Sequence, residues 1–233
     1  MMSRALALLA LQGLLAVGAA AAPCGPLPAG AAAISPAPRG DERGQRLTER
    51  RMAGLAADPA ETLLVGDSIF DGWRSAAADL GRPVTNFGVG GDRTENVLDR
   101  IDRAAFPPGA FRRAVLLIGT NNLARDEACA VLGGISAIVA RLQQRLPGAE
   151  IVVVSILPRG PGLRARREKI EAVNRALAEG QAAMKIRFVN AFTPFDEACA
   201  GQEGCPLLPD RLHPGPEGYR LLGRSIAAAL DGR

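Results

Sequence analysis

The stretch TLLVGDS, residues 62–68, decides the fold. Its first four residues form a short apolar run that ends at Gly66, a pattern typical of a buried strand. Residues 69–80 follow at once with a helical pattern, which Gly81 closes. A strand that runs through glycine directly into a helix is the repeating unit of an α/β protein.

Four more apolar runs follow the first and are predicted to be strands. They lie at residues 84–87, 114–118, 151–156 and 186–189. Between them, apolar side chains recur at the three- and four-residue spacing of helices. The predicted helices lie around residues 97–104, 131–142 and 170–177, with a last one at 216–230.

This alternation predicts the fold class. Strands separated by helices are joined by right-handed crossovers, which place them parallel in one sheet. The strands are continuously rather than alternately apolar, which indicates burial on both faces. We therefore expect a three-layer α/β/α domain with a five-stranded parallel sheet and flavodoxin-like strand order.

The N-terminal 40 residues have a different composition from the rest of the 233-residue chain. Residues 1–22 combine Arg4, an apolar run and four alanines at 19–22, which is typical of a cleaved signal peptide. An uncleaved membrane anchor is the alternative, because the run approaches the length needed to cross a bilayer. Residues 23–40 are rich in Pro, Ala and Gly and are predicted to be a flexible tether. A single domain is expected over residues 41–233, in a protein exported to the periplasm or secreted.

Four cysteines occur in the chain, and an oxidising compartment would allow them to pair. The short loop between Cys199 and Cys205 favours a disulfide there, which leaves Cys24 to pair with Cys129. Free buried thiols are the alternative.

Charge and motif patterns exclude several function classes. The net charge of +4 comes from scattered arginines without interleaved aromatic residues, so no nucleic-acid partner is expected. The glycine loop at 88–92 lacks the third glycine of a dinucleotide-binding motif, because position 93 is Arg93, and no P-loop is present. A single histidine cannot build a multi-histidine metal site, and we expect neither metal nor organic cofactor.

Polar segments follow the predicted strands at the points where they end. In an open parallel sheet, ligands bind beyond the carboxyl ends of the strands. The segments at this edge are Gly66-Asp67-Ser68, Gly88-Val89-Gly90-Gly91-Asp92, Gly119-Thr120-Asn121-Asn122 and Asp210-Arg211-Leu212-His213.

These residue types together suit nucleophilic catalysis. Ser68 is a weak nucleophile until a base takes its proton, and His213, the only histidine, can serve as that base. Asp210, three residues earlier, can orient the imidazole. The backbone N–H groups of Ser68 and Gly91 and the side chain of Asn121 are candidates for an oxyanion hole.

Each residue also has a plain structural interpretation. A serine or an asparagine after a strand often caps the next helix. A glycine loop is commonly only a turn. The convergence of all four segments on one edge of the sheet favours the catalytic interpretation.

The four segments, in this order, resemble the characteristic blocks of the GDSL/SGNH hydrolase family. Within it, the sequence around Asn86–Asp92, residues 119–122, Ile156-Leu157-Pro158-Arg159-Gly160 and Tyr219 looks like the catalytic subunits of the brain-type intracellular platelet-activating factor acetylhydrolases. The resemblance covers roughly residues 60–230 and implies a serine esterase with Ser68, Asp210 and His213 as its triad.

The resemblance also implies a small acyl pocket walled by Ile69, Thr120 and Leu212, and hence short-chain, acetyl-type esters. The substrate would be a small-molecule, glycan or lipid ester, and the protein a monomer or homodimer. An exported carbohydrate O-deacetylase is one alternative, and a non-catalytic binding protein on the same fold is another. Two departures stand out. Those acetylhydrolases are cytoplasmic, whereas this chain is predicted to be exported, and this chain has its own Cys199–Cys205 loop before Asp210.

Overall fold

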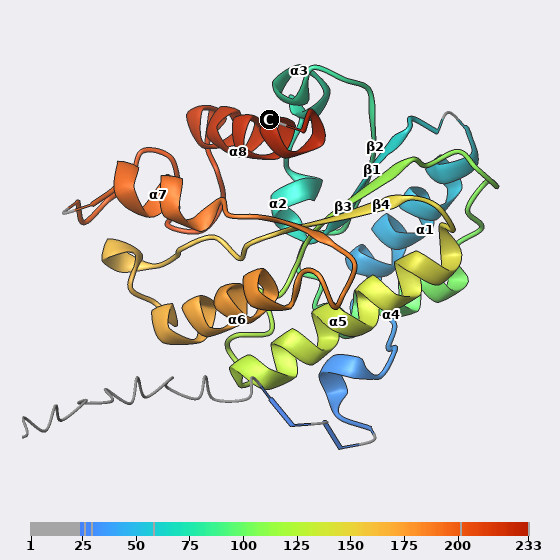
Figure 1. The fold of residues 1–233 in the computed structure, drawn as a ribbon, viewed down its shortest axis with the longest axis horizontal. Coiled ribbons are helices and arrows are strands. Elements are labelled where there is room, and N and C mark those ends of the chain that lie inside the picture. The colour runs from blue at the N-terminus through green and yellow to red at the C-terminus, as the bar shows by residue number, and fades with distance from the viewer. Residues whose placement is uncertain (1–23, 26, 29, 58, 201, 233) are drawn as a thin grey trace, which may run out of the picture.

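The sheet has the predicted topology. The computed structural model describes residues 24, 25, 27, 28, 30–57, 59–200 and 202–232, so the predicted signal peptide lies outside the described residues. Five parallel strands pair in the order β2-β1-β3-β4-β5 (Figure 1). This is the flavodoxin-like order, and the predicted α/β fold class is confirmed.

All five strands lie where the apolar runs predict them. Thr62 of the central strand β1 lies opposite Val84 and Arg113, and Gly66 lies opposite Gly88 and Leu117. The carboxyl ends of β1, β2 and β3 are therefore level, and their following loops meet at one edge. The strands are β1 (Thr62–Gly66), β2 (Val84–Gly88), β3 (Arg113–Leu117), β4 (Glu150–Val154) and β5 (Arg187–Val189).

Two hydrophobic cores hold the helices against the two faces of the sheet. Leu63 and Val65 of β1 point into one core and Leu64 points into the other, and all three are fully buried. Each such side chain contributes ~1.5–3 kcal/mol through burial. On the first face lie α1 (Glu42–Ala57), α4 (Thr94–Arg103), α5 (Ala128–Arg145) and α6 (Arg167–Gly180); on the second lie α2 (Ser68–Asp71), α3 (Ala76–Leu80), α7 (Phe192–Ala198) and α8 (Pro216–Leu230) (Figure 1).

The prediction of one helix over residues 69–80 is wrong. The helix ends after one turn at Gly72 and restarts as α3. A side chain at position 72 would meet the Tyr219 hydroxyl, 2.9 Å from the position of its Cβ. Trp73 then turns inward, where it stacks on Tyr219 and donates a hydrogen bond from Nε1 to Asp79. Packing of the tryptophan thus overrides the helical pattern.

The described residues of 24–40, here called the N-terminal arm, include a segment that packs on the domain. A short 3-10 helix, η1 (Ala32–Ile34), packs on α4 and α5. Gly134 of α5 makes this contact possible, since a Cβ there would lie 2.7 Å from the Ala33 carbonyl oxygen. The Ala37 N–H also donates to the Glu95 carbonyl at 3.0 Å. The amino-acid composition of the arm does not predict this packing, because the packing depends on residues far away in the sequence, such as Glu95 and Gly134.

Two disulfides join the four cysteines. Cys24 is bonded to Cys129 and Cys199 to Cys205, so the favoured pairing is confirmed. The first bond fastens the N-terminal arm to α5. Within the described ranges, no helix has both the length and the apolar character needed to span a bilayer.

Candidate active site

Ser68 lies at the carboxyl edge of the sheet, as its position after β1 predicts. It is the first residue of α2, so its backbone N–H has no acceptor within the helix. The side chain of Asp67 caps this helix by accepting a hydrogen bond from the Ile69 N–H at 3.0 Å. The cap fixes the strand-to-helix turn that presents the Ser68 hydroxyl to the cavity above the sheet.

The only histidine of the chain lies next to this hydroxyl. His213 Nε2 is 2.9 Å from Ser68 Oγ, although 145 residues separate the two in sequence. On the other side of the ring, Nδ1 is 2.6 Å from Asp210 Oδ2. The structure therefore brings a hydroxyl, an imidazole and a carboxylate into one hydrogen-bonded line.

Asp210 is held by its own turn. Its Oδ1 accepts hydrogen bonds from the backbone N–H groups of Leu212 at 3.0 Å and His213 at 2.7 Å. Arg211, between Asp210 and Leu212, has a positive φ of 66°, which closes the turn. Partial burial raises the pKa of the Asp210 carboxyl, but the hydrogen bonds from His213 and Leu212 outweigh this effect and leave the pKa below its ordinary value. The carboxylate is thus ionised and oriented toward the imidazole at neutral pH.

Two residues with potential N–H hydrogen-bond donors, Gly91 and Asn121, line the same cavity as Ser68. Gly91 has a φ of 80°, a backbone conformation that favours glycine. Asn121 uses its side-chain amide to donate a hydrogen bond to the Asp92 carbonyl at 2.8 Å, which holds the amide in place. Asn122 instead has a structural role, because its Oδ1 accepts the N–H of Thr94 at the start of α4.

These groups share one cavity of about 390 Å³. One of its walls comes from α1, through Arg43, Gly44 and Leu47. The cavity is lined by Asp41, Arg43, Gly44, Leu47, Ser68, Asp71, Gly90, Gly91, Asn121, Leu212 and His213.

The three residues expected to wall an acyl pocket are placed differently. Leu212 lines the cavity, whereas Ile69 and Thr120 are almost fully buried and are not among its lining residues. Thr120 is engaged by Arg159, whose Nη1 donates to its carbonyl at 2.8 Å and to its hydroxyl at 2.9 Å.

Sequence reasoning missed the residues that α1 and the N-terminal arm bring to the cavity. Arg43 and Leu47 line it directly. Arg39 supports it from behind, because its Nη1 donates to the Gly90 carbonyl at 2.7 Å. A faint signal exists in the helical spacing of Leu47, Thr48 and Leu55, but many charged residues interrupt it.

Two buried carboxyl groups, those of Asp67 and Asp92, are next in sequence to the cavity residues Ser68 and Gly91. Burial raises the pKa of Asp67 to about 7, and its Oδ2 has no hydrogen-bond partner among the described residues. Burial also raises the pKa of Asp92, and this effect is opposed by ion pairs with Arg100 and Arg39. Ionisation therefore costs more free energy at Asp67 than at Asp92.

Comparison with known proteins points to one family. The profile of the GDSL-like Lipase/Acylhydrolase family matches residues 64–221. The human platelet-activating factor acetylhydrolase IB subunit alpha1 is 35% identical over 142 residues, which cover 58% of this chain and 60% of that protein. The rat protein of the same name is 31% identical over 199 residues, or 82% of this chain and 84% of the relative.

Solved structures agree with this similarity. A structure from Streptococcus pneumonia, named for platelet activating factor, has a TM-score of 0.70 at 26% identity, and the match covers 81% of this chain and 93% of that one. A GDSL-like lipase from Bacteroides thetaiotaomicron has a TM-score of 0.65 at 21% identity and covers 81% of this chain and 97% of its own, which is a likeness of fold.

Proposed function

This chain belongs to the GDSL-like lipase/acylhydrolase family of ester hydrolases, and from that premise we propose that it hydrolyses short-chain esters through an acyl-Ser68 intermediate. The observation that carries the mechanism is the line from Ser68 Oγ to His213 Nε2 at 2.9 Å and from His213 Nδ1 to Asp210 at 2.6 Å. The expected roles are nucleophile, base and orienting carboxylate.

The proposed reaction has two halves. His213 Nε2 takes the Ser68 proton as Oγ attacks the acyl carbon, and the same proton then goes to the leaving alcohol. A water molecule next attacks the acyl group, with His213 again as base, and releases the acid and free Ser68.

Negative charge develops on the acyl oxygen in both halves. We assign its stabilisation to the N–H groups of Ser68 and Gly91 and to the amide of Asn121. Each such donor is typically worth ~3–4 kcal/mol of barrier.

Preference for acetyl-type groups is supported by the small cavity and by the names of the relatives. The volume of about 390 Å³ must hold both halves of the ester. We propose that Leu212 walls the acyl side, with Ile69 and Thr120 as the packed layer behind it. In a series from p-nitrophenyl acetate to the octanoate, kcat/KM should fall gradually, and a clear preference for octanoate would contradict the acetyl assignment.

Export is also part of the proposal. The two disulfides support folding in an oxidising compartment, and Cys24 comes two residues after the predicted signal peptide. Mass spectrometry of the secreted or periplasmic fraction should find a mature N-terminus near residue 23. Intact Met1 in a membrane fraction would instead favour an anchor.

The decisive test locates the nucleophile. A fluorophosphonate probe should modify Ser68, and Ser68→Ala should remain folded while losing activity by at least about 10⁴-fold. Ser225→Ala is the matched control, since Ser225 lies on α8 and its hydroxyl bonds the Leu221 carbonyl. Full turnover by Ser68→Ala, or labelling of another serine, would overturn the mechanism.

A further inference from the structure

A second cavity, of about 670 Å³, lies along α1 beside the catalytic one. Most of the side chains around it are charged, and arginine predominates. It is lined by Pro38, Arg39, Glu42, Arg43, Gln45, Arg46, Thr48, Glu49, Arg50 and Arg103.

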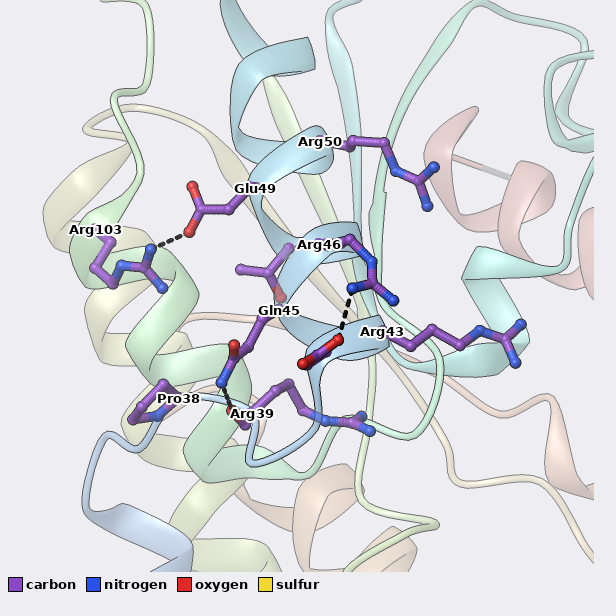
Figure 2. Close-up of a pocket in the computed structure, with 10 residues that line it drawn as sticks. Pro38, Arg39, Arg43, Gln45, Arg46, Glu49, Arg50 and Arg103 are labelled. Carbon is purple, nitrogen blue, oxygen red and sulfur yellow. Dashed lines mark hydrogen bonds and ion pairs between the residues drawn. The ribbon is translucent and has the colours of Figure 1, made fainter.

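Three of these arginines form a row on the helix. Arg43, Arg46 and Arg50 are spaced three and four residues apart and extend from the same side of α1 (Figure 2). Arg43 and Arg50 are separated by seven residues, or ~10 Å along the helix axis. Glu49 points to the other side of the helix, where it pairs with Arg103 (Figure 2).

Ion pairs neutralise only part of this row. Arg46 pairs with Glu42 at 2.9 Å. Arg43 and Arg50 are exposed and have no ion-pair partner in the described part of the chain. The neighbouring Arg51 shows what a structural arginine on this helix does: it binds the Gly88 carbonyl at 2.9 Å and Asp71 at 2.6 Å.

Inside the catalytic cavity, too, no carboxylate of the described residues is left to pair with Arg43. Its two carboxylates besides the triad are Asp41 and Asp71, which Arg39 and Arg51 already engage. Arg43 lines this cavity as well as the one along α1. It therefore offers an uncompensated positive charge to any molecule that reaches from Ser68 toward α1.

We propose that α1 is an anion-binding subsite for the alcohol part of the ester substrate, with Arg43 as its first contact and Arg50 as its second. This inference rests on the proposed function. The ligand is an ester whose alcohol carries a phosphate or carboxylate group, and Arg50 is reached only by alcohols that carry a second anionic group ~10 Å farther along. A guanidinium binds either anion through paired N–H donors.

The test compares two esters that differ by one phosphate, 1-acetylglycerol and 1-acetylglycerol 3-phosphate. The wild-type ratio of kcat/KM, phosphorylated to neutral, should be roughly fivefold or more, and it should shrink between 0.05 and 0.5 M NaCl. Arg43→Gln should bring the ratio close to one. Arg175→Gln is the matched control, because Arg175 is an exposed arginine on α6 that lines neither cavity, and it should keep the wild-type ratio.

A longer anionic alcohol tests the second contact. On an O-acetylated oligogalacturonide, Arg50→Gln should lower kcat/KM severalfold, whereas on 1-acetylglycerol 3-phosphate it should change the ratio little. An equal effect of Arg50→Gln on both substrates would contradict the assignment of Arg50 as a separate, outer contact.

The phosphate could belong to a water-soluble ester or to a membrane lipid. To distinguish these sources, the neutral and phosphorylated acetyl esters are also prepared on long-chain glycerol lipids and presented in phosphatidylcholine vesicles. Preference for the phosphorylated ester both in solution and in vesicles supports the subsite, and the form with the higher kcat/KM identifies the source. A preference confined to vesicles would overturn it, since the surface charge and not the ester would then be recognised.

The remaining outcomes separate the subsite from the proposed function. Hydrolysis of both esters at a ratio near one, or an unchanged ratio in Arg43→Gln, overturns the subsite and leaves the esterase in place. Failure to hydrolyse either ester, together with no probe labelling of Ser68, overturns the esterase mechanism and the subsite with it.

Discussion

The two walls of the catalytic cavity are built in different ways. One wall is the carboxyl edge of the sheet, where Ser68, Asn121 and His213 follow strands within short motifs. The other wall is α1 with the N-terminal arm, where Arg39 is held by a hydrogen bond to the distant Gly90 and Arg43 lines the cavity from α1. We place the chemistry on the first wall and recognition of the alcohol on the second.

The two walls also differ in whether their buried carboxyl group is paired with a positive charge. Behind the arm, the buried Asp92 is paired with Arg100 and with Arg39. Next to Ser68, the buried Asp67 has one oxygen that accepts a hydrogen bond from the Ile69 N–H and another without a partner among the described residues. The wall that carries Ser68 thus contains an unpaired buried carboxyl group at the position that fixes its turn, whereas the buried carboxylate behind the arm is paired with two arginines.

After the loss expected for Ser68→Ala, the largest expected effect on the first wall is at Asp210. Asp210→Asn should lower kcat about 10³- to 10⁴-fold, because the amide cannot stabilise the imidazolium and favours the wrong tautomer of His213. Steady-state kinetics with p-nitrophenyl acetate measures it. Asp196→Asn is a control that removes a carboxylate paired with Arg167 and outside the cavity lining, and it should leave kcat unchanged. A loss below about tenfold in Asp210→Asn would show that His213 does not depend on this carboxylate.

The same contrast explains what the sequence could predict. The strands, their order and the line from Ser68 through His213 to Asp210 follow from apolar runs and from motifs at strand ends, because each signal spans only a few residues. Helix α1 was missed because its buried residues, such as Thr48 and Leu55, are widely spaced among charges. The packing of the arm depends on Gly134 and Cys129, about 100 residues away, which local composition cannot indicate.

The next effect concerns the pH dependence of stability and comes from Asp67. Its pKa of about 7 in the folded protein lies above the ordinary value of about 3.9, so the folded state binds the proton more tightly. The stability that this provides is complete below pH ~4 and is lost as the pH rises to about 7. The loss amounts to roughly 3–4 kcal/mol between pH 4 and pH 8.

Asp67→Asn should remove most of this loss, since the amide keeps an acceptor for the Ile69 N–H and cannot ionise. Urea unfolding at pH 4, 6 and 8 measures the free energy of unfolding. The control is again Asp196→Asn: Arg167 lowers the pKa of Asp196, so that its pH window lies below pH 4 and the variant should lose stability by a similar amount at all three values. An equal pH dependence in wild type and Asp67→Asn would show that Asp67 does not hold its proton.

The smallest effect belongs to the arm wall, at Arg39. Its guanidinium joins the arm to the glycine loop by donating to the Gly90 carbonyl at 2.7 Å and to Asp41 at 2.9 Å, and it covers Gly91, the proposed oxyanion donor. Arg39→Gln should loosen this loop and lower kcat roughly tenfold with little change in KM, because an oxyanion donor acts mainly in the transition state. Arg112→Gln is the matched control, since it breaks the exposed ion pair with Glu61 beside the opposite ends of the strands. If Arg39→Gln raises KM and leaves kcat intact, the arm contributes only to binding, and the two walls are functionally separate as well as structurally distinct.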